Sequence, residues 1–146
     1  MNTSEIRSKE MLDRLRAEGH RITPQRLAVL RLLAESSEHP SVEDIYEAVR
    51  KTFPTTSLAT VYKTISVLKQ MGEVLEIEFS KDSNRYDGNR PHPHPHLICV
   101  RCKKIVDPDL ASISHVTNEL TSETGFKVIG YRLDVQGICP ECQKKS

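Results

Sequence analysis

All four cysteines of this chain fall into two C-x-x-C motifs, Cys99-Val-Arg-Cys102 and Cys139-Pro-Glu-Cys142. Two such pairs supply four thiolates, which form the complete tetrahedral shell of a closed structural zinc site. Thirty-six residues separate the motifs, so we expect each pair to follow a different strand and the zinc to clamp the C-terminal tail onto a sheet. Redox dithiols and free core cysteines are the alternatives, although a thioredoxin-like site needs one such motif in a βαβ context, which is missing.

Composition limits the class of protein to which the chain can belong. Its 146 residues, 37% hydrophobic and 28% charged, suit one globular domain or two small ones. No apolar stretch approaches the ~20 residues of a membrane-spanning helix, and the N-terminus lacks the apolar run of an export signal. We therefore expect a cytoplasmic protein without a membrane partner, in which cysteines serve as metal ligands more often than as disulfides.

The first 86 residues carry the pattern of helices followed by a hairpin. We expect a helix at 4–18, a second that opens at Thr23-Pro24, and two more that are capped by Ser41 and Ser57, each with apolar residues at helical spacing. Residues 74–79 alternate apolar and acidic side chains, as a half-buried strand does, and 80–84 predict a turn before a returning strand at Arg85-Tyr86. This order predicts a winged helix-turn-helix.

The second half begins after a segment rich in proline and glycine. Short strands at 97–100 and 105–106 flank the first cysteine motif, a helix is expected at 109–123, and a long strand at 126–135 precedes the second motif. We therefore predict an α+β fold, with a winged-helix DNA-binding domain at 1–86, a hinge at 87–95 and a zinc-stapled domain at 96–146.

Charge is distributed unevenly along a nearly neutral chain. The formal net charge is +1, and residues 1–86 contain thirteen basic and thirteen acidic side chains, yet residues 48–72 hold four basic residues and no carboxylate. On the helix capped by Ser57, Thr60, Tyr62 and Lys63 lie opposite the apolar stripe, an arrangement that suits contact with DNA. A solvated face, and a packing role for Tyr62, are the simpler interpretations.

Three histidines alternate with prolines in the segment Arg90-Pro-His92-Pro-His94-Pro-His96. Alternate residues of an extended chain share a face, so His94 and His96 can converge on one ion. Asp107 is expected on the neighbouring strand and Asp87 at the end of the wing. Imidazole and carboxylate donors favour Fe(II), Mn(II) or Zn(II). The alternative is a stiff linker with solvated imidazoles.

Together these features resemble the ferric uptake regulator family, over nearly the whole chain. The matching segments are Arg21-Ile-Thr-Pro-Gln-Arg26, His39-Pro-Ser, Ser57-Leu-Ala-Thr-Val-Tyr62, His94-Pro-His96-Leu-Ile-Cys99, Lys104-Ile-Val-Asp107 and the two cysteine motifs. The resemblance implies a metal-dependent repressor that binds palindromic operator DNA as a homodimer, with residues 96–146 as a small α/β dimerisation domain.

The resemblance also implies roles for individual residues. The structural zinc ligands would be Cys99, Cys102, Cys139 and Cys142. A regulatory Fe(II) or Mn(II) would be held by His39, Asp87, His94, His96 and Asp107, and this ion would stabilise the arrangement that binds DNA. The residues matching DNA contacts are Arg21, Ser57, Thr60, Tyr62 and Lys63.

Asp87 and Asp107 are aspartates where iron and zinc sensors commonly have other donors, so the chain is most similar to the peroxide-sensing branch. In that branch, iron-catalysed oxidation of histidine by hydrogen peroxide inactivates the repressor, and His39 and His94 match the oxidised positions. Pro93 and Pro95 stand where iron-sensing members carry ligands of an additional site, which is therefore not expected.

Peroxide sensing has three alternatives. One is an iron-uptake or other metal-homeostasis repressor without peroxide chemistry, and another is a zinc-dependent protein-interaction module. An enzyme is not expected, because the sequence shows no nucleophile–base pair or cofactor loop. It also lacks the His-x-Glu of zinc deaminases.

Overall fold

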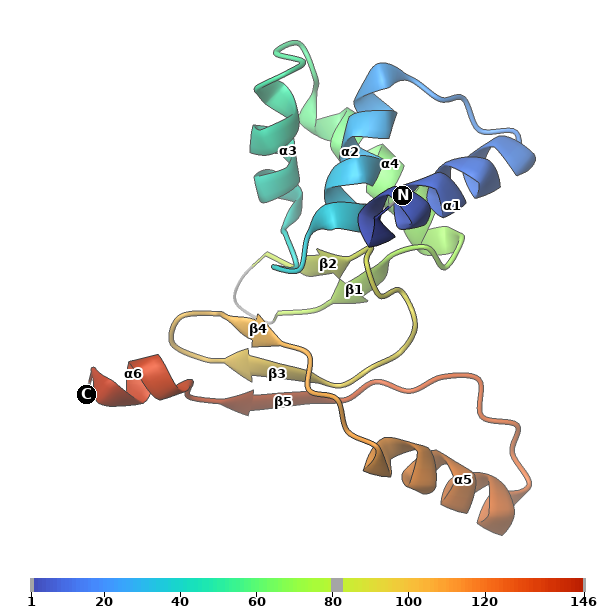
Figure 1. Ribbon diagram of the computed structural model, residues 1–146, viewed down its shortest axis with the longest axis vertical. Helices are drawn as coiled ribbons and strands as arrows, with labels where there is room; N and C mark the ends of the chain where they lie inside the picture. The colour runs from blue at the N-terminus through green and yellow to red at the C-terminus, as the bar shows by residue number, and fades with distance from the viewer. Residues whose placement is uncertain (1, 80–82, 146) are drawn as a thin grey trace. The chain divides into compact units, whose positions relative to one another are not determined.

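The computed structural model describes residues 2–79 and 83–145, and the chain divides into two compact units between His92 and Pro93 (Figure 1). This boundary falls within the predicted hinge at 87–95. Residues 1 and 146, and residues 80–82 of the predicted turn, lie outside the described residues. Within the described part, no helix combines the length and apolarity needed to cross a bilayer.

Four helices form the first unit: α1 (Thr3–Ala17), α2 (Pro24–Glu35), α3 (Val42–Arg50) and α4 (Leu58–Gln70). Their starts follow from local chemistry, because the side chains of Thr23, Ser41 and Ser57 each accept a hydrogen bond from a backbone N–H in the first turn. The four expected helices are therefore confirmed. The first helix was predicted at 4–18 and is observed one residue earlier at each end.

The apolar stripes of these helices meet in one core, and α2 contacts each of the other three helices. Members of all four stripes are buried, including Leu30, Leu33, Ile45 and Leu68, each with no exposed surface. Burial of a side chain of this size contributes about 1.5–3 kcal/mol to the hydrophobic driving force. The first unit thus has a conventional helical core.

A short antiparallel hairpin follows the helices, with β1 (Leu75–Ile77) paired to β2 (Arg85–Asp87) in the register Glu76↔Tyr86. The Glu76 carboxylate accepts hydrogen bonds from the Tyr86 hydroxyl and the Asn84 amide, and Lys69 of α4 forms an ion pair with it. Burial raises the pKa of Glu76, but these donors outweigh it and lower the pKa overall. The ion pair with Lys69 ties the hairpin to α4, which completes the winged helix-turn-helix.

The second unit contains a three-stranded sheet in the order β4-β3-β5, formed by β3 (His96–Cys99), β4 (Ile105–Val106) and β5 (Asp134–Gly137). β3 and β4 are antiparallel, whereas β3 and β5 are parallel. Parallel neighbours need a long crossover, usually with a helix, and α5 (Ser112–Thr124) lies on that connection, with a left-handed Gly125 at its C-cap. A last helix, α6 (Pro140–Lys144), follows Cys139 (Figure 1).

The α+β class is confirmed, but the long strand predicted at 126–135 is wrong. β5 begins only at Asp134, and residues 126–133 are not in a strand. Its partner β3 has four residues, so β5 finds ladder hydrogen bonds over four residues as well. In the part of the chain that the structure describes, the backbone of residues 126–133 meets β3 only at its end, where the His96 N–H donates to the Leu133 carbonyl at 3.0 Å, so its apolar alternation is not matched by a strand ladder.

Candidate metal centres and DNA-facing helix

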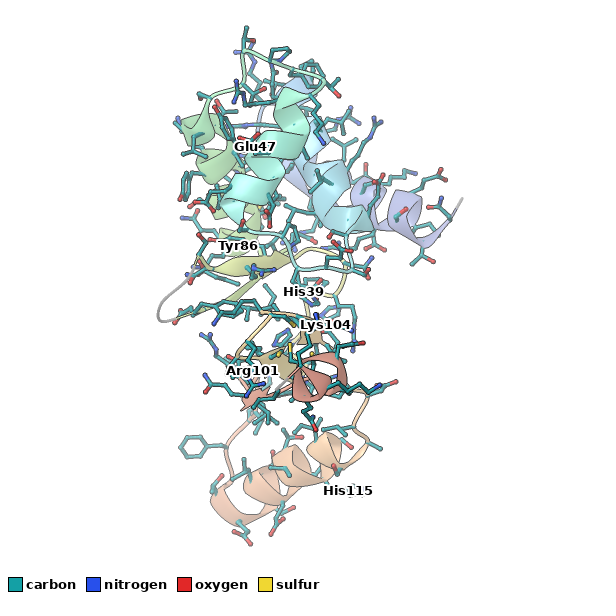
Figure 2. All side chains as sticks on the ribbon, turned by 90° about the vertical axis from the view of Figure 1, so that its left-hand side faces the viewer. His39, Glu47, Tyr86, Arg101, Lys104 and His115 are labelled. Atoms are coloured by element: carbon teal, nitrogen blue, oxygen red, sulfur yellow. The ribbon has the colours of Figure 1, made fainter. Side chains whose placement is uncertain are left out.

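The second unit gathers all four cysteines into one cluster, in which the sulfur atoms lie within 4.8 Å of one another. β3 ends at Cys99 and β5 ends two residues before Cys139, so the parallel pairing brings both motifs to the same end of the sheet. Figure 2 shows the sulfur atoms in yellow near the labelled Arg101 and Lys104. None of the four is in a disulfide.

The spacing of the thiols fits zinc. A tetrahedral ion with Zn–S bonds of about 2.3 Å sets its sulfur atoms about 3.8 Å apart, and the Cys102 and Cys139 Sγ atoms are 3.7 Å apart. Backbone N–H donors of Cys102 and Cys139 lower the pKa of Cys99 to about 6, whereas the hydrogen bond with Cys139 raises the pKa of Cys142 to about 12. Zinc binding would deprotonate the remaining thiols, and the ion would then hold four thiolates at this distance.

In the first unit, His39 and Asp87 lie opposite each other. Ser41 forms an antiparallel bridge with Arg85, and the Tyr86 N–H donates to the Pro40 carbonyl at 2.9 Å. The same register, continued by one pair, sets His39 across from Asp87, and the distance from His39 Nε2 to Asp87 Oδ2 is 3.4 Å. Both side chains are buried.

The backbone of His39 is held in an unfavourable conformation, with φ at 56°. For a residue with a Cβ this left-handed region costs roughly 1–2 kcal/mol. The Arg85 guanidinium donates to the His39 carbonyl at 3.0 Å and keeps the loop against β2. Figure 2 shows the labelled His39 near the hairpin that contains Tyr86.

The loop after Asp87 is anchored to the helices. Asp87 Oδ1 accepts hydrogen bonds from the N–H groups of Asn89 and Arg90, so Oδ2 is the oxygen that faces His39. Between these residues, the Gly88 carbonyl accepts from the buried Arg7 guanidinium at 2.8 Å. A Cβ on Gly88 would lie 2.8 Å from the Leu33 Cβ. The carboxylate of Asp87 is thus oriented by its own turn and by the packing beneath it.

In the second unit, His94, His96 and Asp107 converge in the same way. The His94 and His96 rings are 4.4 Å apart between centroids, and Asp107 lies 3.5 Å from His94 Nε2 and 3.8 Å from His96 Nε2. The pairing of Leu97 with Val106 in β3 and β4, continued by one residue, places Asp107 across from His96. Two imidazoles and a carboxylate suit Fe(II), Mn(II) or Zn(II).

The electrostatic surroundings favour a neutral His96. Burial lowers its pKa, and the neighbouring His94 lowers it further, while the hydrogen bond with Asp134 and the charge of Asp107 act in the opposite direction. A metal-binding imidazole must be neutral, so this environment suits a ligand.

The residues predicted to contact DNA lie on α4 and before α2. Tyr62 and Lys63 are exposed on α4, with Tyr62 at 49% of its full exposure, and Arg21 is exposed before α2. Ser57 and Thr60 also have a structural role, because Ser57 Oγ accepts from the Thr60 N–H and lies 2.9 Å from the Thr60 hydroxyl. All five remain predictions as DNA contacts.

Sequence reasoning missed several residues that position these groups. Arg7 and Gly88 act through tertiary contacts for which no local pattern exists. The contact between Asp134 and His96 could have been predicted in principle. If two neighbouring strands both end at one zinc site, they are parallel, and their register then places Asp134 beside His96.

Comparisons with known proteins agree with this arrangement. The model of the ferric uptake regulator family matches residues 17–136. The peroxide-responsive repressor PerR of Staphylococcus aureus (strain USA300) is 40% identical over 137 residues, which cover 94% of this chain and 92% of that protein.

Solved structures are similar as well. The Helicobacter pylori ferric uptake regulator Fur, whose structure is described as revealing three functional metal-binding sites, superposes with a TM-score of 0.82 at 27% identity, covering 97% of this chain and 95% of that one. The Campylobacter jejuni peroxide stress regulator gives a TM-score of 0.72 at 31% identity, covering 91% and 97%.

Proposed function

The chain belongs to the ferric uptake regulator family, whose members are transcriptional regulators and not enzymes, and we propose that it is a metal-dependent repressor that binds operator DNA as a homodimer. The observation that carries the proposal is the pair of converging ligand groups, one in each unit of the chain. They are His39 with Asp87 in the first unit, and His94, His96 and Asp107 in the second.

These five residues together bind one regulatory Fe(II) or Mn(II). An ion that takes ligands from both units favours the one arrangement of the units in which all ligands reach it, and it shifts the population toward that state. A shift from 1:99 to 99:1 requires about 5.5 kcal/mol of differential binding. The four cysteines hold a second, structural zinc, which keeps the second unit folded whether or not the regulatory ion is bound.

The DNA-binding surface is the outward face of α4, with Tyr62, Lys63, Ser57 and Thr60, together with Arg21. No carboxylate lies between residues 48 and 72. Although Lys69 pairs with Glu76 and Arg50 lies 3.9 Å from Glu47, Lys63 is exposed on α4 and can meet a phosphate. In a symmetric dimer, two such helices contact two half-sites of a palindrome.

The dimer forms through the second unit. α5 buries none of its residues, and Val116, Leu120, Phe126 and Ile129 are between 50% and 91% exposed. An apolar surface of this kind marks an interaction site, and a second copy of the chain is the occupant that the family membership supports.

Hydrogen peroxide inactivates the repressor through its own ligands. Iron(II) at the regulatory site supplies the redox chemistry that activates peroxide. One peroxide oxygen is added at a ring carbon of His39 or His94, the other leaves as water, and the imidazole is the two-electron reductant. An oxidised ring loses its basic nitrogen as a ligand, so the ion and then the DNA are released. The similarity to the PerR protein of Staphylococcus aureus and to the Campylobacter jejuni peroxide stress regulator supports this branch.

The second candidate is an iron-dependent uptake repressor without peroxide chemistry, which the similarity to the Helicobacter pylori Fur structure favours. Mass spectrometry after peroxide treatment separates the two. We expect a one-oxygen gain on a peptide with His39 or His94 in the Fe(II) form and none in the Mn(II) form. If the Fe(II) form gains no oxygen on either histidine, the protein is a metal sensor only.

DNA binding tests the proposal as a whole. A duplex is first selected from a random library with Mn(II)-loaded protein, and its affinity is then measured by fluorescence anisotropy at about 0.15 M salt, because salt sets the strength of phosphate contacts. Removal of the regulatory ion should weaken binding by about 5–150-fold, the usual range of such coupling. Equal affinity of the protein with only its thiolate-bound zinc would refute the proposal.

A further inference from the structure

His96 contacts a carboxylate on each side of its ring, and only one of the two belongs to the proposed ligand set. Its Nε2 lies 3.8 Å from Asp107 Oδ1, whereas its Nδ1 lies 3.2 Å from Asp134 Oδ1. The sheet explains this geometry, because Asp134 of β5 is the direct parallel partner of His96 in β3. Asp107 follows β4 on the opposite side of β3. All three residues are in the second unit.

Asp134 is itself held in place. Its other oxygen, Oδ2, accepts a hydrogen bond from Arg132 Nε at 3.1 Å, so both carboxylate oxygens have a defined partner. Asp134 is only partly exposed, and His96 beside it is buried.

This pair of contacts decides which ring nitrogen can bind a metal. An ionised carboxylate only accepts hydrogen bonds, so the Nδ1 atom of His96 must carry the proton. In a neutral imidazole the lone pair is then on Nε2. Nε2 is the nitrogen on the side of Asp107.

We propose that Asp134 is a positioning residue for the regulatory ion: it fixes the tautomer and the orientation of His96, so that Nε2 is presented with Asp107 and His94. The inference rests on the proposed regulatory site and adds to it a residue that binds no metal. A carboxylate on the far nitrogen of a ligating histidine raises the basicity of the ligand, and its loss typically costs 10–100-fold in metal affinity.

The test compares three variants in the full chain with zinc in the thiolate site. Asp134→Ala removes the acceptor, Asp134→Asn keeps the size but not the charge, and Asp134→Glu restores a carboxylate. Exchange of the exposed Glu123 for Ala is the control for loss of an acidic residue in the same unit. Mn(II) affinity is measured by electron paramagnetic resonance, and the tautomer of His96 by two-bond ¹H–¹⁵N correlation spectra without the second metal.

We expect Asp134→Ala to weaken Mn(II) binding by about 10–100-fold and to turn the Nδ1–H form of His96 into a mixture of tautomers. Asp134→Glu should recover much of the affinity, Asp134→Asn less, and Glu123→Ala should match the wild type. A merely structural role for Asp134 would lower the melting temperature and leave the tautomer unchanged.

Two results would overturn the inference: Mn(II) affinity of Asp134→Ala equal to that of the wild type, or a His96 tautomer that does not depend on Asp134. Failure of the proposed function is distinguishable from both. In that case the wild-type protein itself takes up no Mn(II) beyond the thiolate site, while the ¹⁵N spectra still report whether Asp134 fixes the ring.

Discussion

The two units of this chain are stabilised in different ways. Thirteen buried apolar residues form the core of the first unit. In the described part of the second unit, the buried apolar residues are Ile98 and two of the clustered cysteines, while α5 and the segment after it expose theirs. The first unit is stabilised by a core of apolar side chains, whereas in our proposal the second unit depends on a metal ion and on a second copy of the chain.

The difference also explains how the sites are divided. A small domain with few core residues needs a staple, and the thiolate cluster provides one at the end of β3 and β5. The helices of the first unit have a conventional core, so the exposed face of α4 is not required for folding and is available for the DNA contact that we propose. In our proposal, one side of α4 therefore stabilises the fold and the opposite side recognises DNA.

Removal of the thiolate-bound zinc should have the largest effect. Structural zinc contributes about 10–16 kcal/mol in small metal-binding domains, so a strong chelator should unfold residues 93–145 and leave α1–α4 intact. Amide NMR spectra of the full chain would show loss of dispersion only for the second unit. If both units unfold together, or neither does, the comparison between them is wrong.

In the first unit, Leu30→Ala should be the costly change. Leu30 has no exposed surface, and large-to-small exchange of a buried leucine costs about 2–5 kcal/mol. Urea unfolding followed by signals of the first unit measures this loss. Ile6, which is 44% exposed on α1, provides the control, and Ile6→Ala should change stability by less than about 0.5 kcal/mol. Similar losses in the two variants would contradict a core-based first unit.

Ile129→Asp should act on assembly and not on the core. Ile129 is 91% exposed in the chain, so a carboxylate there costs little in an isolated unit. If a second copy covers this surface, the charge should weaken the dimer by about 2 kcal/mol or more, as at an interface hot spot. Analytical ultracentrifugation across a dilution series measures the change, and an unaltered dimer would place the interface elsewhere.

Gly88→Ala tests how tightly the first unit is packed around a proposed ligand. The added Cβ would lie 2.8 Å from Leu33 and 2.9 Å from Met11, and such overpacking costs typically 1–3 kcal/mol. Mn(II) affinity should fall as well, because Asp87 precedes Gly88 directly. Gly130→Ala is the control in the second unit, since its Cβ would meet only Pro93 at 3.5 Å. If Gly88→Ala and Gly130→Ala change stability equally, tight packing around Gly88 is contradicted.

The smallest expected effect is an increase in the stability of the second unit. Lys103 follows the first cysteine motif with φ at 67°, and its N–H donates to the Cys99 carbonyl at 3.0 Å. Lys103→Gly removes a left-handed strain of roughly 1–2 kcal/mol. Because this exceeds the entropic cost of glycine, about 0.5–1 kcal/mol, the second unit should become slightly more stable. Thermal unfolding of the zinc-loaded protein provides the measurement. Lys104→Gly, at an ordinary φ, should show no such gain, and a loss at Lys103 would show that the strain is not relieved.

Most of the fold could be predicted because its signals are local. Caps such as Thr23, Ser41 and Ser57 and the apolar stripes that follow them specify each helix over a few turns. Local signals could not decide whether residues 126–135 form a long strand. A strand requires a partner, and whether one exists depends on the length of β3, a segment about thirty residues earlier in the chain.

The residue types of both metal groups, and the spacing of the cysteine motifs, were determined by the sequence alone, since donor chemistry does not depend on the fold. Only the tertiary structure decided which donors face each other. The pairs His39–Asp87, His96–Asp107 and His96–Asp134 all arise from strand register. Register joins residues that are far apart in the sequence through backbone hydrogen bonds, and a shift by one residue would turn each ligand to the opposite face.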